Sequence, residues 1–254
     1  MNLVMGKVYF IGAGPGDPEL ITLKGRRLLD EADIVVYAGS LVNPALLSNI
    51  KAKCYDSARL HFEEIMTIME QGVLSGKQVV RLHSGDPCLY GAIKEQIVYL
   101  ESQGITYEIV PGVSSATAAA AVLHEELTRP EVSQTVIITR LSGKTPVPER
   151  ERLRTLAALG ATMLIFLSIQ SIEEVVAELC YGYPLTTPAA VVYKATWSEQ
   201  QIIRGTLNTI ARQVQEAGIR KTAIIVVGSI LDSELKAVSK LYDKASEHGY
   251  REKS

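Results

Sequence analysis

The chain has 254 residues, of which 47% are hydrophobic and 21% are charged, and its formal net charge is −2. This composition is typical of a folded protein and excludes an intrinsically disordered chain, and the length favours two domains, because single cores seldom grow beyond about 250 residues. The basic residues are scattered and balanced by acidic ones, so nucleic acid and anionic membrane surfaces are not expected partners.

Short runs of β-branched residues alternate with helical periodicity in the first half, which is typical of strand-helix-strand units on a largely parallel sheet. Strands are predicted at Val8–Ile11, Ile34–Tyr37, Lys53–Asp56, Val79–His83 and Tyr107–Val110. Helices are predicted to start near Asp17 and to cover Leu60–Leu74 and Gly91–Gln103. Pro111 and Gly112 then interrupt the pattern, and an Ala-rich helix capped by Ser114 or Ser115 is expected to follow.

The second half starts the alternation again. Strands are predicted at Thr135–Thr139, Met163–Leu167, Ala189–Tyr193, Gln201–Arg204 and Ala223–Val227, with helices near Glu149–Leu159, Gln170–Tyr181 and Leu207–Ala217. We therefore predict an α/β protein with two domains, residues 1–113 and residues 114–254. Because ligands bind beyond the carboxyl ends of strands in open sheets, the site is expected in the loops there, in a cleft between the domains.

A glycine-rich loop, Gly12–Asp17, follows the first predicted strand. Its backbone N–H groups are not screened by large side chains, so the loop and the helix expected after it suit a carboxylate or phosphate. A dinucleotide-binding fingerprint fits poorly, because it needs glycine where Asp17 stands and tolerates Pro15 badly. A purely structural turn remains the alternative.

A second loop, Ser84–Gly91, joins a buried strand to a helix. Gly85 permits the close approach of a ligand, and Asp86 offers a hydrogen-bond acceptor. The alternative is that Asp86 caps the helix, with Pro87 at its first position. His83, at the end of the strand, is interpreted as a packed residue rather than a catalytic one.

The cysteines and histidines indicate neither disulfides nor a metal. Cys54, Cys88 and Cys180 are far apart and in no ligand spacing, and we expect three buried free thiols. No protein-bound metal is expected, because His61, His124 and His248 have no partner spacing either. No signal peptide or membrane span is predicted, so the protein is expected to be cytoplasmic.

The sequence shows no Ser-His-Asp order, paired-carboxylate motif or Walker motif, so hydrolysis and phosphoryl transfer lack support. Alkyl transfer from a sulfonium to a nucleophilic carbon asks less of side chains, because catalysis rests on aligning donor and acceptor in a dry cleft.

Several loops together resemble the tetrapyrrole methylases over nearly the whole chain. The glycine-rich loop, Arg81–Gly91 (RLHSGDPCLYG), Pro111–Ser115 (PGVSS), Pro188–Gln200 (PAAVVYKATWSEQ) and Thr222–Gly228 (TAIIVVG) carry the resemblance. Three further segments, Tyr37–Val42, Leu127–Glu149 and Tyr193–Trp197, look like the members that methylate carbon 11 of precorrin-4 or cobalt-precorrin-4.

The resemblance implies two αβα domains, a homodimer and S-adenosylmethionine as cofactor, with S-adenosylhomocysteine as product. The matching cofactor contacts are Pro15, Ser84, Gly85, Asp86, Leu89, Ser114, Ser115, Leu167 and Ala195. The precorrin carries many carboxylates, so its expected contacts are Gly14, Gly16, Asp17, Arg81, Arg140 and Lys144. For the three cationic residues, salt bridging within the protein is an equal alternative.

Other functions stay open at this stage. Family relatives methylate other ring carbons or other substrates, including uroporphyrinogen, diphthine and ribosomal RNA, although the basic surface expected for RNA is missing. A non-catalytic protein that binds a tetrapyrrole or an adenosyl compound is an alternative of a different class. The sequence identifies no general base, and it leaves open whether the substrate carries cobalt.

Overall fold

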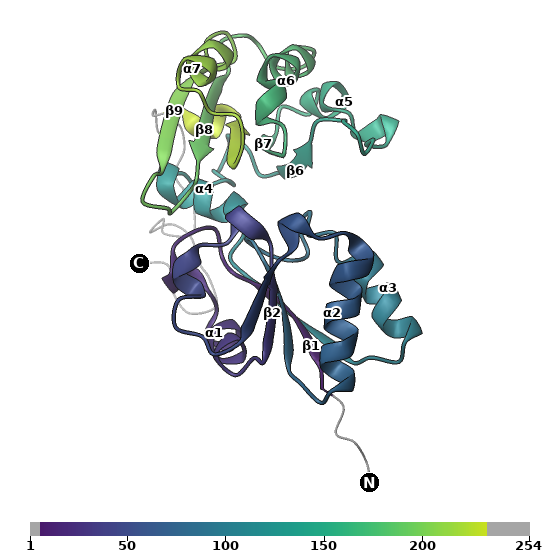
Figure 1. Ribbon diagram of the computed structural model, residues 1–254. Coiled ribbons are helices and arrows are strands. Elements are labelled where there is room, and N and C mark those ends of the chain that lie inside the picture. Colours follow the sequence, from purple (N-terminus) through teal and green to yellow (C-terminus); the bar gives the residue numbers. More distant parts are fainter. Residues whose placement is uncertain (1–5, 233–254) are drawn as a thin grey trace, which may run out of the picture. The chain divides into compact units, whose positions relative to one another are not determined.

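Two separate five-stranded sheets organise the chain (Figure 1). The computed structural model describes residues 6–232, which divide into two units. Unit 1 contains the described residues up to Ala118 together with Lys194–Gln200, and unit 2 contains Ala119–Tyr193 and the described residues from Gln201 onward. The short segment Lys194–Gln200 therefore belongs to unit 1, although unit 2 precedes and follows it in the sequence.

The sheet of unit 1 is entirely parallel, as predicted. Its strands are β1 (Val8–Gly12), β2 (Ile34–Tyr37), β3 (Lys53–Asp56), β4 (Val79–His83) and β5 (Tyr107–Val110), in the spatial order β3-β2-β4-β1-β5. Because β1 lies between β4 and β5, the loops that leave these three strands emerge side by side at one edge. That edge is where open parallel sheets bind ligands.

Helices cover both faces of this sheet. α2 (Phe62–Leu74) and α3 (Lys94–Ser102) pack on one face, and α1 (Leu23–Asp30) packs on the other. In α2 the apolar side chains of Ile65, Met66 and Met69 turn inward, as helical spacing predicts. Four single-turn 3₁₀ helices complete the unit: η1 (Pro18–Leu20), η2 (Gly39–Leu41), η3 (Pro44–Leu46) and η4 (Ser57–Arg59).

The helix expected at Asp17 starts later. The Asp17 carboxylate accepts a hydrogen bond from Glu19 N at 2.9 Å and caps only η1. α1 starts at Leu23, after Thr22, whose hydroxyl accepts a hydrogen bond from Gly25 N. The glycine-rich loop is thus separated from the positive end of α1 by one turn and a linker, which removes the helix from the expected anion site.

The sheet of unit 2 is mixed, whereas a largely parallel one was predicted. Its strands are β6 (Val136–Arg140), β7 (Thr162–Phe166), β8 (Pro188–Tyr193), β9 (Gln201–Thr206) and β10 (Ala223–Val227), in the order β6-β7-β10-β8-β9. Only β6 and β7 pair in parallel. Seven residues, Lys194–Gln200, join β8 to β9, and a parallel crossover needs a dozen or more, so these two strands are antiparallel.

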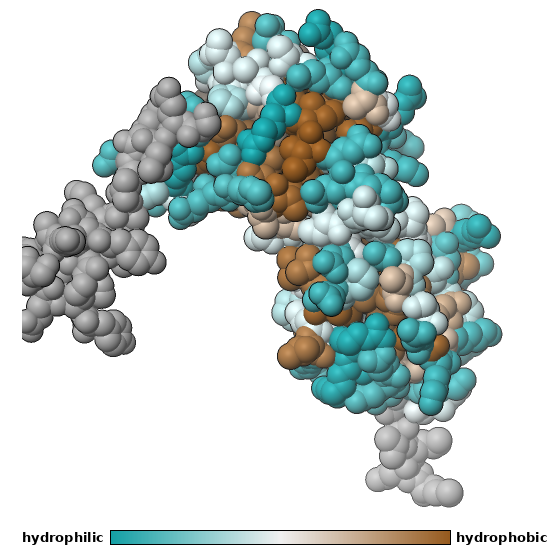
Figure 2. All heavy atoms as spheres, turned by 90° about the vertical axis from the view of Figure 1, so that its left-hand side faces the viewer, coloured by the Kyte–Doolittle hydropathy of each residue, from teal (hydrophilic) through white to brown (hydrophobic). Residues whose placement is uncertain are grey.

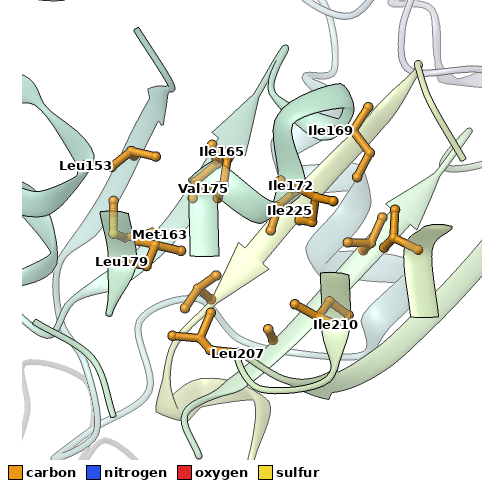
Figure 3. Packing of buried hydrophobic residues seen from close by; sticks show 14 of the residues in the cluster. Leu153, Met163, Ile165, Ile169, Ile172, Val175, Leu179, Leu207, Ile210 and Ile225 are labelled. Carbon is orange, nitrogen blue, oxygen red and sulfur yellow. The ribbon is translucent and has the colours of Figure 1, made fainter. Parts of the chain in front are cut away.

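The core of unit 2 lies between this sheet and three helices, α5 (Leu153–Ala157), α6 (Ile172–Leu179) and α7 (Ile210–Glu216). Figure 3 shows Leu179 beside Met163, Val175 beside Ile165 and Ile172 beside Ile225; Leu153 and Ile210 belong to the same cluster. Each side chain of this size contributes about 1.5–3 kcal/mol when fully buried. The remaining helices are α4 (Ser115–Leu123), η5 (Glu149–Glu151), η6 (Ile169–Ser171) and η7 (Ser229–Leu231).

The prediction of buried thiols is wrong. Cys54, Cys88 and Cys180 are free but exposed, because each lies at a strand edge, a turn or a helix end. Apolar residues also reach the surface of each unit, shown in brown in Figure 2. Within residues 6–232, no helix is both long enough and apolar enough to cross a bilayer.

Candidate active site

Three glycine backbones meet where the loops leave β1, β4 and β5. A Cβ on Gly112 would lie 2.2 Å from the carbonyl oxygen of Gly85, and a Cβ on Gly12 would lie 2.5 Å from the same oxygen. Both contacts are with backbone, which cannot rotate away. We call Gly12, Gly85 and Gly112 the glycine junction; it lets the three loops approach more closely than any side chain would allow.

Hydrogen bonds fasten the junction. Gly85 N donates to Gly14 O at 2.8 Å, and Gly14 N donates to Gly85 O at 3.3 Å. The Asp86 carboxylate accepts from Gly112 N at 2.8 Å through Oδ2 and from Cys88 N at 2.7 Å through Oδ1. Asp86 therefore joins the second loop to the third and caps the turn that follows it. It does not start a helix, since α3 begins at Lys94.

Gly112→Ala should destabilise unit 1, because the new methyl group collides with backbone at 2.2 Å. Overpacking of this kind typically costs 1–3 kcal/mol, so we expect a loss of roughly 2 kcal/mol in chemical denaturation. Gly143→Ala is the matched control: a Cβ there has no heavy atom within 4 Å, and its stability should change by less than about 0.5 kcal/mol. Equal stability of the two variants would contradict the close approach of the loops.

The serines around the junction divide into two kinds. Ser114 Oγ accepts from Ala116 N at 3.2 Å at the start of α4, which confirms the predicted cap. The hydroxyls of Ser84 and Ser115 make no hydrogen bond to any other residue in the range 6–232, although both residues are half-buried. These two hydroxyls, beside the partly buried Leu89, form a mixed polar and apolar surface that suits an amphipathic ligand.

The glycine-rich loop is not the open set of amides that the sequence suggested. Ala13 N donates to His83 O at 2.7 Å, Gly14 N donates to Gly85 O, and Asp17 N donates to Thr196 Oγ1 at 2.9 Å. The N–H of Gly16 is the loop amide between Ala13 and Asp17 that makes no hydrogen bond to another described residue. Contacts far along the chain use the other amides, and local sequence gives no sign of such contacts.

The segment Lys194–Gln200 holds the tip of this loop, a role that the sequence analysis missed. Trp197 Nε1 donates to Pro15 O at 2.8 Å, and its indole lies against Gly16, where a Cβ would be 2.1 Å from Trp197 Cδ1. Asn43 Nδ2 donates to Gly16 O at 2.8 Å. Trp197 is the one tryptophan of the sequence and lies in a segment that carries the family resemblance, but neither signal points to Pro15 or Gly16 as its partners.

Ala195, a predicted cofactor contact, lies between two residues with unfavourable backbone angles. Lys194 has a φ of 46° and Thr196 a φ of 69°, a region that costs about 1–3 kcal/mol for non-glycine residues and occurs most often at functional sites. Ala195 is buried, and neither its N–H nor its C=O bonds to another residue of the described range. Buried backbone groups normally have partners, so this position fits a ligand.

Leu167 is the predicted cofactor contact in unit 2, and it too lies on backbone with an unfavourable angle. It follows β7 directly, its φ is 54°, and its side chain is 75% exposed. Ser168 Oγ accepts from Leu141 N at 2.8 Å, which joins the carboxyl ends of β6 and β7. A positive φ at a non-glycine residue occurs most often at functional sites, and the exposed side chain leaves Leu167 accessible, so Leu167 is compatible with the predicted contact with an adenosyl group.

Arg140 and Lys144 differ in their surroundings. The guanidinium of Arg140 donates to Thr145 O at 2.8 Å and to Pro146 O at 3.3 Å, so it stabilises the conformation of the loop that follows it. Lys144 is exposed at the tip of that loop and makes no ion pair with any residue of the described part of the chain. Lys144 therefore has a free ammonium group, and Arg140 positions it.

Arg81 is buried, with 6% of its surface exposed. Its Nε donates to Gln96 Oε1 at 3.2 Å and its Nη1 donates to Val36 O at 3.1 Å, and burial lowers the pKa of the guanidinium to about 10. Arg81 was expected among the substrate contacts or in a salt bridge. The structure shows neither a carboxylate partner among residues 6–232 nor an open position; the guanidinium supports the sheet and α3.

His83 is a packed residue, as the sequence analysis interpreted it. It is 4% exposed, its ring centroid lies 6.1 Å from that of Phe10, and its Nε2 has no hydrogen-bond partner among residues 6–232. Burial lowers the pKa of His83 to about 3, with a further contribution from the charge of Arg81. The imidazole is therefore neutral at physiological pH.

This pKa predicts acid sensitivity. Unfolded His83 takes up a proton below about pH 6.5, whereas folded His83 does so only near pH 3, so stability is lost as the pH falls between these values. Between pH 7 and pH 5 the loss attributable to His83 is roughly 2 kcal/mol. His83→Leu lacks this titrating group. Between pH 7 and pH 5 its free energy of unfolding, measured by urea denaturation at each pH, should therefore fall by roughly 2 kcal/mol less than that of the parent.

The control for this experiment is His124→Asn. His124 is exposed with a φ of 59°, a conformation that Asn tolerates, so this variant should keep the pH dependence of the parent. An undiminished acid loss in His83→Leu would show that His83 is not the buried neutral group described here.

No group of three or more His, Cys, Asp or Glu side chains in the described range is arranged to hold a metal ion. His248 lies outside that range.

With this geometry in view, comparison with known proteins is decisive. The family model for Tetrapyrrole (Corrin/Porphyrin) Methylases matches residues 7–211. The chain belongs to the tetrapyrrole methylase family. It is 57% identical to a cobalt-precorrin-4 C(11)-methyltransferase of Methanocaldococcus jannaschii over 96% of both chains. It is also 48% identical to a precorrin-4 C(11)-methyltransferase of Pseudomonas aeruginosa, over 96% of this chain and 98% of the relative.

Solved structures agree with the family assignment. The X-ray structure of a cobalt precorrin-4 methyltransferase matches with a TM-score of 0.87 and 48% identity, covering 89% of this chain and 96% of the other. A uroporphyrin-III C-methyltransferase from Thermus thermophilus, in complex with S-adenosyl homocysteine, matches with a TM-score of 0.77 and 28% identity, covering 89% and 99%. The α/β fold with two sheets, predicted from the sequence, is confirmed.

Proposed function

We propose that this tetrapyrrole methylase transfers a methyl group from S-adenosylmethionine to carbon 11 of precorrin-4 or cobalt-precorrin-4, a step of cobalamin biosynthesis. The observation that carries the proposal is identity of 57% and 48% with carbon-11 methyltransferases over 96% of this chain. A relative named for uroporphyrinogen III is 36% identical over 89% of the chain, which makes methylation of another ring carbon the weaker alternative.

The described residues fit the cofactor. The free backbone groups of Ala195, the free hydroxyls of Ser84 and Ser115, and the exposed Leu167 offer hydrogen bonds and apolar contact. The full set assigned to the cofactor, all carried over from the family resemblance, is Pro15, Ser84, Gly85, Asp86, Leu89, Ser114, Ser115, Leu167 and Ala195. When bound, S-adenosylmethionine supplies a methyl group on a positively charged sulfur.

The protein contributes alignment and exclusion of water. The glycine junction holds the loops after β1, β4 and β5 in fixed mutual positions, so a ring carbon is presented to the methyl group in one orientation. Leu89 and Leu167 exclude water from the reacting groups. His83 is buried and neutral and does not serve as a base, and no covalent bond between enzyme and substrate is needed.

For the tetrapyrrole, the proposal assigns different roles to the predicted contacts. Gly16 N–H and Lys144 have donors without partners in the described range, and these suit acetate and propionate side chains. Gly14, Asp17 and Arg140 shape the loops that carry those donors. Arg81 supports the sheet beneath them. The two units would divide the work, with the glycine-rich loop and substrate trough in residues 1–113 and completion of the cofactor site in residues 114–254.

We also propose that the enzyme works in the cytoplasm as a homodimer, with neither nucleic acid nor a membrane as partner. The proposal of a homodimer rests on the family resemblance. Exposed apolar side chains of unit 2, such as Ile138 and Ile202, provide surface that a second subunit would cover.

The deciding experiment incubates the pure protein with labelled S-adenosylmethionine and, in separate reactions, precorrin-4 and cobalt-precorrin-4. We expect a new methyl group at carbon 11, located by NMR. Methylation of another ring carbon would replace the carbon-11 assignment. Absence of transfer, combined with calorimetric binding of S-adenosylhomocysteine, would indicate the non-catalytic binding protein.

An Arg140→Ala, Lys144→Ala double variant should lose methylation by roughly tenfold or more and keep its affinity for S-adenosylhomocysteine, since a charge-assisted hydrogen bond contributes about 1.5–3 kcal/mol. The loss should appear in kcat/KM for the tetrapyrrole. Arg220→Ala, Lys221→Ala removes the same charges from another exposed loop of unit 2 and should leave turnover unchanged. Turnover of the first variant within twofold of the parent would show that the 140–148 loop does not bind the macrocycle.

A further inference from the structure

The segment Lys194–Gln200 touches the cofactor residues and the glycine-rich loop at once. Ala195, with its free backbone groups, stands two residues before Trp197. Trp197 in turn donates to Pro15 O at 2.8 Å, and Thr196 Oγ1 accepts from Asp17 N at 2.9 Å. If Ala195 is displaced, Thr196 and Trp197, the next two residues, move with it, and their hydrogen bonds to Asp17 and Pro15 move the tip of the glycine-rich loop.

The segment is braced against bending. Lys194 Nζ lies 4.9 Å from the centre of the Trp197 ring and pairs with Glu199 at 2.7 Å. Gln200 Oε1 accepts from Thr196 N at 2.7 Å, and Trp197 N donates to Lys194 O at 3.0 Å. With these bonds the segment moves as one piece, so Ala195 and Trp197 do not shift independently.

Each residue at the tip of the glycine-rich loop has a hydrogen-bond partner, and the segment Lys194–Gln200 supplies the partners of Pro15 and Asp17. Trp197 holds the carbonyl of Pro15, Asn43 holds the carbonyl of Gly16 at 2.8 Å, and Thr196 holds the amide of Asp17. The edge of the indole occupies the space of a Gly16 side chain, since a Cβ there would lie 2.1 Å from Trp197 Cδ1. The indole thus fixes the direction of the free Gly16 N–H, which lies between the two residues that the segment holds.

We propose that Trp197 is a positioning residue that couples occupancy of the cofactor site to the conformation of the glycine-rich loop, and so to tetrapyrrole binding. The inference rests on the proposed function, because it uses Ala195 as a cofactor contact and Gly16 as a substrate contact. Trp197 itself touches neither ligand in this scheme. It acts through Pro15 and Gly16.

The first test uses the natural probe in the protein. Because the sequence has one tryptophan, excitation of indole reports on Trp197 alone. Addition of S-adenosylhomocysteine should change the emission with a midpoint equal to the Kd from calorimetry. Calorimetric binding with unchanged emission would overturn the coupling and leave the cofactor proposal intact, whereas absence of calorimetric binding would contradict the cofactor proposal itself.

The second test separates positioning from stability. Trp197→Phe keeps an aromatic ring and removes the N–H donor, so KM for the tetrapyrrole should rise by roughly threefold to tenfold, the value of about one hydrogen bond. The kcat should stay within twofold of the parent. Ser198→Ala is the control within the segment, since its hydroxyl bonds only to Glu199, and it should match the parent. A lower melting temperature of Trp197→Phe with unchanged KM would show a structural role only.

A double-mutant cycle tests whether Gly16 acts through the indole. Gly16→Ala should raise KM for the tetrapyrrole in the parent, because the methyl group displaces Trp197. In a Trp197→Ala background the same change should have less than a twofold effect, since the obstacle is gone. Equal effects in both backgrounds would contradict the proposal. The fluorescence test on the parent protein remains valid whether or not these variants fold.

Discussion

Close contact between backbones, with no side chains between them, is the constraint on which the rest of the site depends. At the carboxyl edge of the sheet of unit 1, Gly12, Gly85 and Gly112 approach within distances that leave no room for a Cβ. The paired hydrogen bonds of Gly14 with Gly85 and the bridge from Asp86 to Gly112 then convert three separate loops into one rigid body. The hydroxyls of Ser84 and Ser115, which are proposed to contact the cofactor, are positioned by these loops. A methyl transferase gains from this rigidity, because its catalysis rests on alignment rather than on reactive side chains.

Buried polar groups in unit 1 serve this framework. Arg81 and His83 both lie in β4; Arg81 donates hydrogen bonds to Gln96 and to the carbonyl of Val36, and His83 packs beside Phe10. A cation and a neutral imidazole without a carboxylate partner are costly in a protein interior. Of the two groups only the guanidinium of Arg81 is charged at neutral pH, and it places positive charge beneath loops that are proposed to receive a polyanionic substrate.

Much of the fold could be predicted from the sequence, because apolar periodicity is local. The strands of both sheets were found within one or two residues of their bounds, and α2 and α3 followed from helical spacing. The direction of β8, β9 and β10 was not predicted, since periodicity carries no information on which neighbour a strand pairs with. The partners of the glycine-rich loop were missed for a related reason: Thr196 is 179 residues away from Asp17, and only the folded chain brings them together. The burial of Arg81 was not predicted, because a charged residue in a strand looks the same in the sequence whether it is exposed or buried.

The segment Lys194–Gln200 packs in unit 1 although unit 2 precedes and follows it in the sequence, and this affects the order in which the chain can fold. The hydrogen bond from Trp197 to Pro15 spans 182 residues, so the first unit to be synthesised is completed by a piece made much later. Contacts of this sequence separation slow folding, because the intervening chain must be ordered before they form. During synthesis, residues up to Ala118 emerge with the tip of the glycine-rich loop still lacking its indole and the hydroxyl of Thr196. The loop therefore takes its final shape only after β8 and the segment that follows it have been made.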